Sequence, residues 1–251
     1  EKNNKYLVLL KPTKRLQQES RVNIGEYYFT VKKKLDYGRA LVEFNAPVEI
    51  IIKRYGRIPL PPYIRNKNQD QSRYQTVYAE KEGSSAAPTA GLHFSEKLIG
   101  KMREMGVLIA KVDLEIGLDT FRPISSVEIE KHRIHSENYQ ISDTEAGKIV
   151  RSKEIGKRVI AVGTTVVRVL ETLMSRYGEI KKDRGVTDIY IYPGYKFKIV
   201  DWMITNFHLP RSTLLVMVSA FAGRENILNS YEQAKRNNYR FFSFGDCMLI
   251  K

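Results

Sequence analysis

Residues 84–94, with the sequence SSAAPTAGLHF, combine small side chains with a histidine. Small side chains let a backbone approach a ligand or a neighbouring element closely. His93 ends the run, and an imidazole titrates near neutral pH, as a general base requires. We therefore expect Thr89 and Gly91 to lie against a substrate beside His93. Tight packing between a helix and a strand is the alternative interpretation.

The other histidines lie in the segments KHRIHSENY, which holds His132 and His135, and TNFHLP, which holds His208. His132 and His135 are three residues apart with Glu137 nearby, but no HExxH or comparable ligand pattern is present. The single cysteine, Cys247, excludes an internal disulfide and a metal site built from several cysteines of this chain. We therefore expect no metal, and a reducing, cytoplasmic environment.

A second candidate site lies in the segment AVGTTVVR, where an apolar strand ends at Gly163 and a helix starts at once. The free N–H groups and the dipole of a helix start attract a carboxylate or a phosphate. Thr164 and Thr165 would then contact such an anion, with Arg168 as a possible helper. The alternatives are that one threonine caps the helix and that Arg168 forms surface salt bridges. No GxGxxG or Walker motif supports NAD or P-loop chemistry.

The segment TNFHLPRST follows an apolar strand that carries Asp201. Strand ends of α/β sheets are common ligand sites, and Asn206 and His208 alternate with an aromatic residue there. An ordinary turn is the alternative. Tyr192 and Tyr195 offer rings on which a base could stack, or they cover a sheet edge.

The chain has 251 residues, with 42% hydrophobic and 28% charged residues, which fits a globular protein with a sizeable core. Its formal net charge of +14 suggests a polyanionic partner such as nucleic acid. The longest apolar run, residues 213–223, is too short to cross a bilayer and predicts a buried helix or strand. We expect neither a signal peptide nor membrane association.

Residues 1–65 predict a basic, β-barrel-like domain. Apolar and aromatic runs at 6–10, 27–31 and 40–44 predict strands, and the prolines in residues 58–64 predict a stiff connector. The candidate nucleic-acid-binding residues lie here: Lys14, Arg15, Lys32, Lys33 and Lys34. A solvated turn is the alternative for the cluster at 32–34.

Residues 66–251 predict an α/β domain with a mixed or largely parallel sheet. Ser95 and the capping box at 142–145 predict helix starts. Strands are expected at 107–116, 158–162, 188–192, 198–207 and 240–244. Residues 163–178 predict a helix with Arg168 and Glu171 opposite its apolar face and Gly178 as its stop.

Seven segments resemble, in order, the S-adenosylmethionine:tRNA ribosyltransferase-isomerase family of queuosine biosynthesis. They are RIPLPPYI, RYQTVYAEKEGSSAAPTAGLHF, IHSENY, VIAVGTTVVRVLET, IYIYPGYKFKIVD, ITNFHLPRSTLLVMVSAFAG and YRFFSFGDCML. Each segment alone is weak, but their number and order are specific.

The resemblance implies an α/β domain with a smaller inserted β-barrel. It implies transfer and isomerisation of the ribosyl moiety of S-adenosylmethionine onto 7-aminomethyl-7-deazaguanine at the wobble position of tRNA. The product is epoxyqueuosine-tRNA, and adenine and methionine are released. S-adenosylmethionine is the ribosyl donor, no metal is needed, and we expect a monomer.

Two features depart from the family pattern. Members normally carry a further N-terminal segment with an NDTRVIPARL-like stretch, which is absent from this chain. The family's LHVGxGTF segment reads LEIGLDTF here, with Glu115 and Asp119 at two of the usual positions. If that histidine is an indispensable base, Glu115 must replace it.

Together, the residue types and the resemblance assign candidate roles. The candidate catalytic residues are His93, Glu137, His208 and Asp201. The candidate substrate-binding residues are Thr89, Gly91, His135, Thr164, Thr165, Arg168, Tyr192, Tyr195 and Asn206. A non-catalytic RNA-binding protein and a different nucleoside-transferring enzyme are the competing interpretations.

Overall fold

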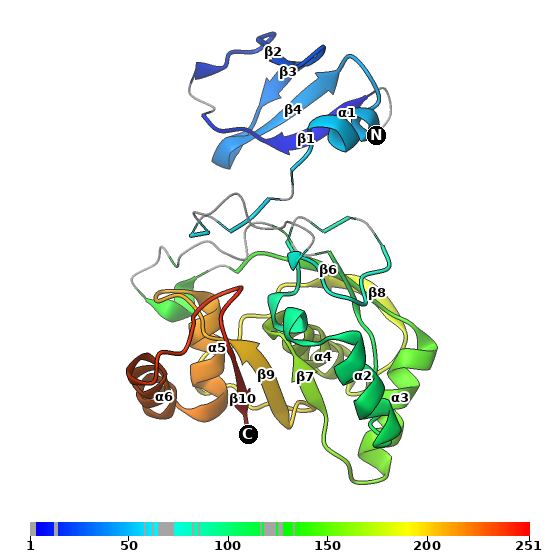
Figure 1. Cartoon of the computed structure of the whole chain (residues 1–251), viewed down its shortest axis with the longest axis vertical. Coiled ribbons are helices and arrows are strands. Elements are labelled where there is room, and N and C mark those ends of the chain that lie inside the picture. The colour runs from blue at the N-terminus through cyan, green and yellow to red at the C-terminus, as the bar shows by residue number, and fades with distance from the viewer. Residues whose placement is uncertain are drawn as a thin grey trace. The chain divides into compact units, whose positions relative to one another are not determined.

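The computed structural model describes residues 4–12, 15–57, 59–61, 63–64, 73–81, 83–84, 86–115, 117, 124, 128–132 and 134–251. The chain divides into two compact units, Glu1–Ile58 and Pro59–Lys251 (Figure 1). No helix in the described ranges is both long and apolar enough to span a membrane.

The first unit is built on a four-stranded antiparallel sheet. Its strands are β1 (Lys5–Leu9), β2 (Arg21–Ile24), β3 (Tyr27–Lys34) and β4 (Arg39–Phe44), in the order β1-β4-β3-β2. Alternate residues of β3 and β4 form its core, with Phe29, Val31, Ala40 and Val42 buried. Among the described residues β1 and β2 are edge strands, so the sheet there is open and does not close into the predicted barrel. Helix α1 (Val48–Tyr55) follows β4 and buries Ile51.

The second unit contains two three-stranded sheets. In one, β7 (Ile160–Val162) pairs in parallel with β9 (Trp202–Asn206), and β10 (Cys247–Ile250) pairs antiparallel with β9. The other is antiparallel and holds β5 (Asp113–Glu115), β6 (Glu137–Ile141) and β8 (Asp183–Thr187) in the order β5-β6-β8. The arrangement is mixed rather than largely parallel, since only β7 and β9 pair in parallel among the described strands.

The helices of this unit are α2 (Glu96–Glu104), α3 (Asp143–Glu154), α4 (Thr164–Tyr177), α5 (Thr213–Ala222) and α6 (Arg224–Arg236). Figure 1 shows α5 and α6 on one side of β10, β9 and β7, with α2 and α3 on the other. The predicted caps are confirmed: Ser95 and Ser142 accept the N–H groups of Leu98 and Glu145, and Gly178 ends α4 in the left-handed conformation.

Helix α4 contacts strands of both sheets, β7 and β9 of one and β8 of the other. It is therefore buried on most of its circumference, including Arg168 and Glu171. The alternative in which Arg168 forms surface salt bridges is therefore wrong, and Glu171, which was also placed opposite the apolar face, is buried as well. The periodicity of α4 was correct, but a helix between two sheets has no free face on which to leave charges.

Three predicted strands differ from the structure. Of residues 107–116, only β5 is a strand. Residues 188–192 follow β8 and are not a strand, and the carbonyl of Ile189 accepts a hydrogen bond from the Arg168 side chain instead. Residues 240–244 form a turn, because Phe242 has φ +71° and the N–H of Asp246 bonds back to the carbonyl of Arg240. The last strand is β10, which begins at Cys247.

Candidate active site

Two adjoining clefts open where β7 and β9 end, beside the short 3-10 helix η4 (Thr89–His93). They share Thr89, Asn206, His208 and Leu214 on their walls and contain about 470 Å³ and about 460 Å³ of empty space, part of it open to solvent. We call the first the aromatic cleft; the remainder of its wall is Tyr63, Phe207, Leu209, Pro210, Ser212, Phe242 and Ser243. We call the second the α4 cleft; the remainder of its wall is Ala87, Pro88, Ala90, Leu114, residues 162–166 and Thr205.

Asn206, the last residue of β9, joins the segments that line these clefts. Its side-chain Oδ1 accepts from the Thr89 hydroxyl at 3.0 Å, and its Nδ2 lies 3.2 Å from the carbonyl oxygen of Phe242. Since a carbonyl oxygen only accepts, the amide nitrogen must face Phe242. The same nitrogen lies 2.9 Å from Nε2 of His93. Nε2 of His93 is therefore the acceptor, and the proton of the neutral ring sits on Nδ1.

His93 is half-buried, and its surroundings favour the neutral ring. Burial lowers the pKa of His93; the Asp246 carboxylate opposes this effect, and Arg240 adds to it. A protonated Nε2 would also face the N–H of Asn206, which disfavours the same charged form. His93 is thus held as a neutral imidazole whose basic nitrogen is oriented by Asn206.

The α4 cleft ends at a helix start without a side-chain cap. Gly163 is the N-cap, with φ +95° and ψ 147°, a conformation that suits glycine. Thr164 and Thr165 follow as the first helical residues and are each 7% exposed. Neither is the cap, and within the described ranges no side chain caps this helix start. This helix start can therefore accept an anion, as its sequence suggested.

Glu137, predicted as catalytic, and Arg168, predicted to bind substrate, form a buried ion pair. Nη1 of Arg168 donates to Oε2 of Glu137 at 2.6 Å, and their side chains are 3% and 0% exposed. Arg168 also donates to the backbone carbonyls of His135, Thr187 and Ile189. These bonds join α4 to β6 and β8. The pair lies beneath the clefts and reaches the α4 cleft through a 3.5 Å contact between Oε1 of Glu137 and the Thr165 hydroxyl.

His135 is placed with this ion pair, and its Nε2 lies 3.5 Å from Oε1 of Glu137. Its carbonyl is one of the acceptors of Arg168. Neither His135 nor Glu137 lines the two clefts. His135, Glu137 and Arg168 therefore support the start of α4 without lining the clefts themselves.

His208 lines both clefts but is suited to structure rather than proton transfer. Burial lowers its pKa to about 3, so the ring stays neutral at physiological pH. Its Nε2 lies 2.9 Å from the Thr205 hydroxyl, and its backbone N–H donates to Tyr231 at 2.7 Å. We assign His208 to the cleft wall.

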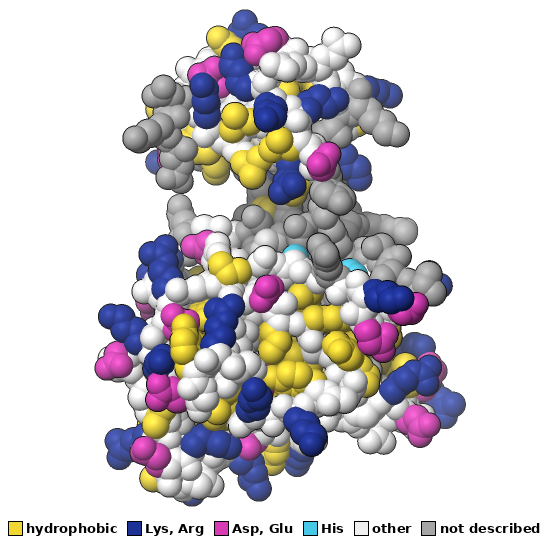
Figure 2. Space-filling view, turned by 180° about the vertical axis from the view of Figure 1, so that it is seen from behind, with side chains coloured by type: hydrophobic (Ala, Val, Ile, Leu, Met, Phe, Trp, Pro, Cys, Tyr) yellow, Lys and Arg dark blue, Asp and Glu magenta, His cyan; other side chains and the backbone are white. Residues whose placement is uncertain are grey.

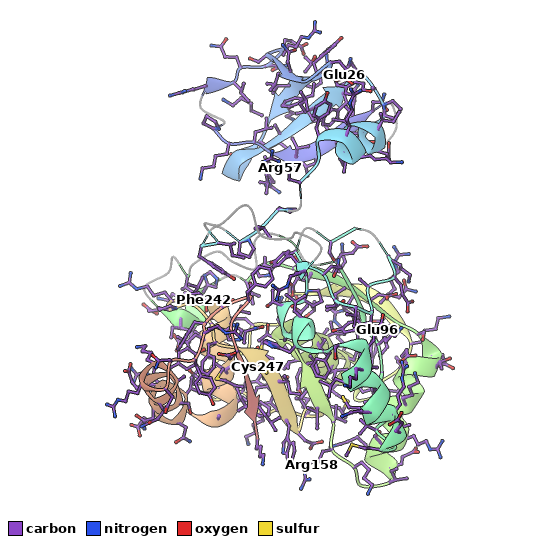
Figure 3. All side chains as sticks on the ribbon, viewed as in Figure 1. Glu26, Arg57, Glu96, Arg158, Phe242 and Cys247 are labelled. Atoms are coloured by element: carbon purple, nitrogen blue, oxygen red, sulfur yellow. The ribbon has the colours of Figure 1, made fainter. Side chains whose placement is uncertain are left out.

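His93 contacts the shared wall residue Asn206 but is itself on the wall of neither cleft, and three further candidates also lie outside both clefts. Asp201 precedes β9, bonds the backbone N–H of Val159 at 2.7 Å and pairs with Lys153, so it lies at the end of the sheet opposite Asn206. In Figure 3, Phe242, whose carbonyl contacts Asn206, lies at one end of the sheet. Arg158, which precedes the Asp201 partner Val159, lies at the other end. Tyr195 donates to the buried carboxylate of Glu171, and Tyr192 packs against Tyr190.

Glu171 organises the segment after Tyr195. Its carboxylate accepts from the backbone N–H groups of Lys198, Ile199 and Val200 at 2.9–3.3 Å. The carboxylate is fully buried. It accepts hydrogen bonds from three backbone N–H groups of a loop, which need such partners when they are buried.

Gly91 is packed against protein rather than open to a cleft. A Cβ placed there would overlap the Tyr78 hydroxyl and lie 2.8 Å from Cγ2 of Thr76. The preceding small residues, Ala87 and Ala90, do line the α4 cleft. Part of the small-residue segment is thus packed against protein, and part of it faces a cleft.

Replacing Gly91 by alanine is expected to lower the free energy of unfolding by about 1–3 kcal/mol, because the added methyl overpacks the contact with Tyr78. Gly147→Ala is the control: Gly147 lies in α3 with no atom near an added Cβ, and the change should stabilise by about 0.5–1 kcal/mol. Thermal unfolding measures both. A rise in KM with an unchanged melting temperature would instead make Gly91 a substrate contact.

The aromatic cleft contains residues that sequence reasoning missed. Tyr63, Phe242 and Ser243 come from the proline-rich connector and from the segment interpreted as a strand. The signal was present in YRFFSFGD, where Gly245 allows a turn: a Cβ there would overlap the backbone of Arg240 and Phe241. Among the described residues, no group of three or more metal-binding side chains is found.

Of the candidate tRNA-binding residues, Lys32 is already paired. Its Nζ lies 3.1 Å from Glu19 and 3.3 Å from Glu43, and hydrogen bonds to these carboxylates raise its pKa. Arg15, Lys33 and Lys34 are exposed. Lys14 lies outside the described residues, as does Asp119. Figure 2 shows Lys and Arg side chains scattered over one face of the first unit.

The chain is similar to proteins of one kind. The sequence profile of a family described as "Queuosine biosynthesis protein" matches residues 1–250. An S-adenosylmethionine:tRNA ribosyltransferase-isomerase from Halothermothrix orenii is 49% identical over 247 residues, 97% of this chain and 72% of the relative. One from Moorella thermoacetica is 53% identical over 229 residues, 90% of this chain and 67% of the relative.

A solved structure is similar as well. The crystal structure of an S-adenosylmethionine tRNA ribosyltransferase from Thermotoga maritima has a TM-score of 0.53 and 31% identity. The match covers 99% of this chain and 71% of the other.

Proposed function

This chain belongs to the queuosine biosynthesis protein family, and we propose that it acts as an S-adenosylmethionine:tRNA ribosyltransferase-isomerase. It transfers and isomerises the ribosyl moiety of S-adenosylmethionine onto 7-aminomethyl-7-deazaguanine at the wobble position of tRNA. Epoxyqueuosine-tRNA forms, and adenine and methionine leave. The observation that carries the site assignment is the meeting of two clefts at Asn206, next to a neutral, oriented His93.

The α4 cleft receives the methionine part of the donor. Its helix start presents uncapped N–H groups and the positive end of the dipole, which suit a carboxylate. The Thr164 and Thr165 hydroxyls lie at the same place, and Ala87, Ala90 and Leu114 provide an apolar wall for the methylene chain. Arg168 supports this helix from below through Glu137 rather than by touching the carboxylate.

His93 acts as the general base. The sulfonium of S-adenosylmethionine acidifies the protons on the ribose C5′, and Nε2 of a neutral imidazole can accept one of them. In the free protein this nitrogen accepts from Asn206, so that amide must yield when the substrate proton arrives. Asn206 is thus the positioning residue that holds His93 in its basic tautomer.

The test of this function is incubation of the complete gene product with S-adenosylmethionine and tRNA that carries 7-aminomethyl-7-deazaguanine. Release of free adenine with a gain of mass on the tRNA is expected. Binding of tRNA without adenine release would instead identify a non-catalytic RNA-binding protein. Turnover with another nucleoside donor only would identify a different transferase.

The basic first unit contributes to tRNA binding. Residues 1–58 contain 13 Lys and Arg against six Asp and Glu. Lys33 and Lys34 are exposed at the end of β3, whereas Lys32 is neutralised by two glutamates. Phosphates of the tRNA would therefore be contacted by Lys33 and Lys34 in preference to Lys32.

Replacing both Lys33 and Lys34 by alanine is expected to weaken tRNA binding and to reduce the slope of log K against log salt by about one for each lysine. Lys32→Ala is the matched control on the same strand, with a clearly smaller change in slope. Filter binding or fluorescence anisotropy over a series of salt concentrations measures both. Equal effects of Lys32→Ala and the double variant, or salt-independent binding, would contradict this contact.

A further inference from the structure

The aromatic cleft has the chemistry of a site for a flat, polar-edged molecule. Its wall includes the aromatic residues Tyr63 and Phe242, with Leu209, Pro210 and Leu214 completing an apolar surface. The rings of Tyr63 and Phe242 pack together at 5.1 Å between centroids and form one continuous aromatic patch. Aromatic rings of this kind provide stacking surfaces for nucleobases.

Polar groups interrupt this wall at one place. The hydroxyls of Tyr63 and Ser243 lie 2.5 Å apart, and burial raises the pKa of Tyr63, so its phenol stays protonated. A hydroxyl both donates and accepts, which suits the mixed donors and acceptors on the edge of a purine-type base.

Phe242 is held in its place by an unusual backbone. Its φ of +71° is rare for a bulky residue. Its N–H donates to the carbonyl of Phe207 at 3.0 Å, and its carbonyl accepts from Asn206 at 3.2 Å and from the N–H of Gly245 at 3.0 Å. A strained conformation fixed by three hydrogen bonds is typical of a functional position. The same contacts tie the Phe242 ring to the Asn206 and His93 pair.

We propose that the aromatic cleft binds a purine-type base through stacking on Phe242, with the Tyr63 and Ser243 hydroxyls at its edge. The inference rests on the proposed function, in which both the leaving adenine and the 7-deazaguanine acceptor have this chemistry. Occupation of the aromatic cleft by the base and of the α4 cleft by the methionine part leaves the ribose at the shared wall of Thr89 and Asn206, beside His93.

The decisive variant is Phe242→Gly, because glycine adopts φ +71° without strain. The change removes the ring while easing the backbone, and a melting temperature close to that of the unaltered protein separates a loss of binding from unfolding. Asn238→Gly is the matched control: Asn238 also has positive φ, at 56°, but is exposed and lies outside both clefts. Phe242→Tyr keeps the stacking surface and should retain binding.

Calorimetric titration with free adenine and, separately, with free 7-aminomethyl-7-deazaguanine measures the effect, together with KM for S-adenosylmethionine and for tRNA. Phe242→Gly is expected to weaken one base by about 5- to 150-fold, the range for loss of one stacking contact. Weaker adenine binding with a raised KM for S-adenosylmethionine assigns the cleft to the donor's base. Weaker deazaguanine binding with a raised KM for tRNA assigns it to the acceptor's base.

The proposal is overturned if Phe242→Gly binds both bases as the unaltered protein does, or if the unaltered protein binds neither. A failure of the proposed function is distinguishable from this result. If no adenine is released from S-adenosylmethionine, but base binding still depends on Phe242, the base site holds and ribosyl transfer is wrong.

Discussion

Replacing His93 by alanine is expected to slow adenine release by about 10²- to 10⁴-fold, the usual contribution of a positioned general base. The imidazole is half-buried, and its basic Nε2 is directed by Asn206, which lines both clefts. Alanine removes the only proton acceptor that we place at the ribose. Single-turnover release of labelled adenine measures the chemical step, and an unchanged rate would remove His93 from the mechanism.

The pH dependence of the same step provides a second readout. Burial lowers the pKa of His93 below its ordinary value of 6.5. The protonated ring cannot accept a proton, so the rate should rise with pH through a midpoint below 6.5 and then level off. This rise of the rate with pH should be absent from the His93→Ala variant. His132→Ala is the control, since His132 packs against Tyr190 outside both clefts and should leave the rise intact.

Replacing Glu137 by glutamine is expected to lower the free energy of unfolding by about 3–5 kcal/mol. The change keeps the side chain's size but leaves the guanidinium of Arg168 buried without its counter-charge. Burial already lowers the pKa of Arg168, and the charge of Glu137 opposes that effect. The melting temperature should fall by roughly 6–20 °C for a chain of this size.

The double variant Glu137→Gln with Arg168→Met tests the cause. Removing both charges should recover only part of the lost stability, because no buried charge is left unpaired but the carbonyls of His135, Thr187 and Ile189 lose their donor. Glu232→Gln in α6 is the control, since its ion pair with Lys235 is exposed and should change stability by less than about 1 kcal/mol. Equal losses from Glu137→Gln and the double variant would mean that packing, rather than charge, is what Glu137 provides.

Sequence alone identified the features that depend on neighbours within a few residues. Ser95 and Ser142 cap their helices, and Gly178 ends α4 in the left-handed conformation. In each case one hydroxyl or one backbone angle determines a boundary, and nothing distant competes with it. The order of seven short motifs identified the family for a similar reason, because this order is a property of the linear sequence and does not depend on folding.

Sequence reasoning failed where distant contacts decide the outcome. The segment 240–244 has the composition of a strand, but Asn206 and Phe207 bond the backbone of Phe242 and keep it in a turn. The sequence of residues 32–34 predicts three equivalent basic side chains. In the structure, Glu19 and Glu43 neutralise Lys32, whereas the other two lysines are exposed.

The chemistry of the candidate site belongs to the tertiary structure. Periodicity placed Arg168 and Glu171 on the polar face of a helix, but a second sheet covers that face and turns both charges into buried anchors. The sequence identified His93 as a candidate base, but the tautomer of its ring depends on the side-chain amide of Asn206, 113 residues away. Burial and hydrogen bonds set the protonation of a side chain, and both are made by segments that only folding brings together.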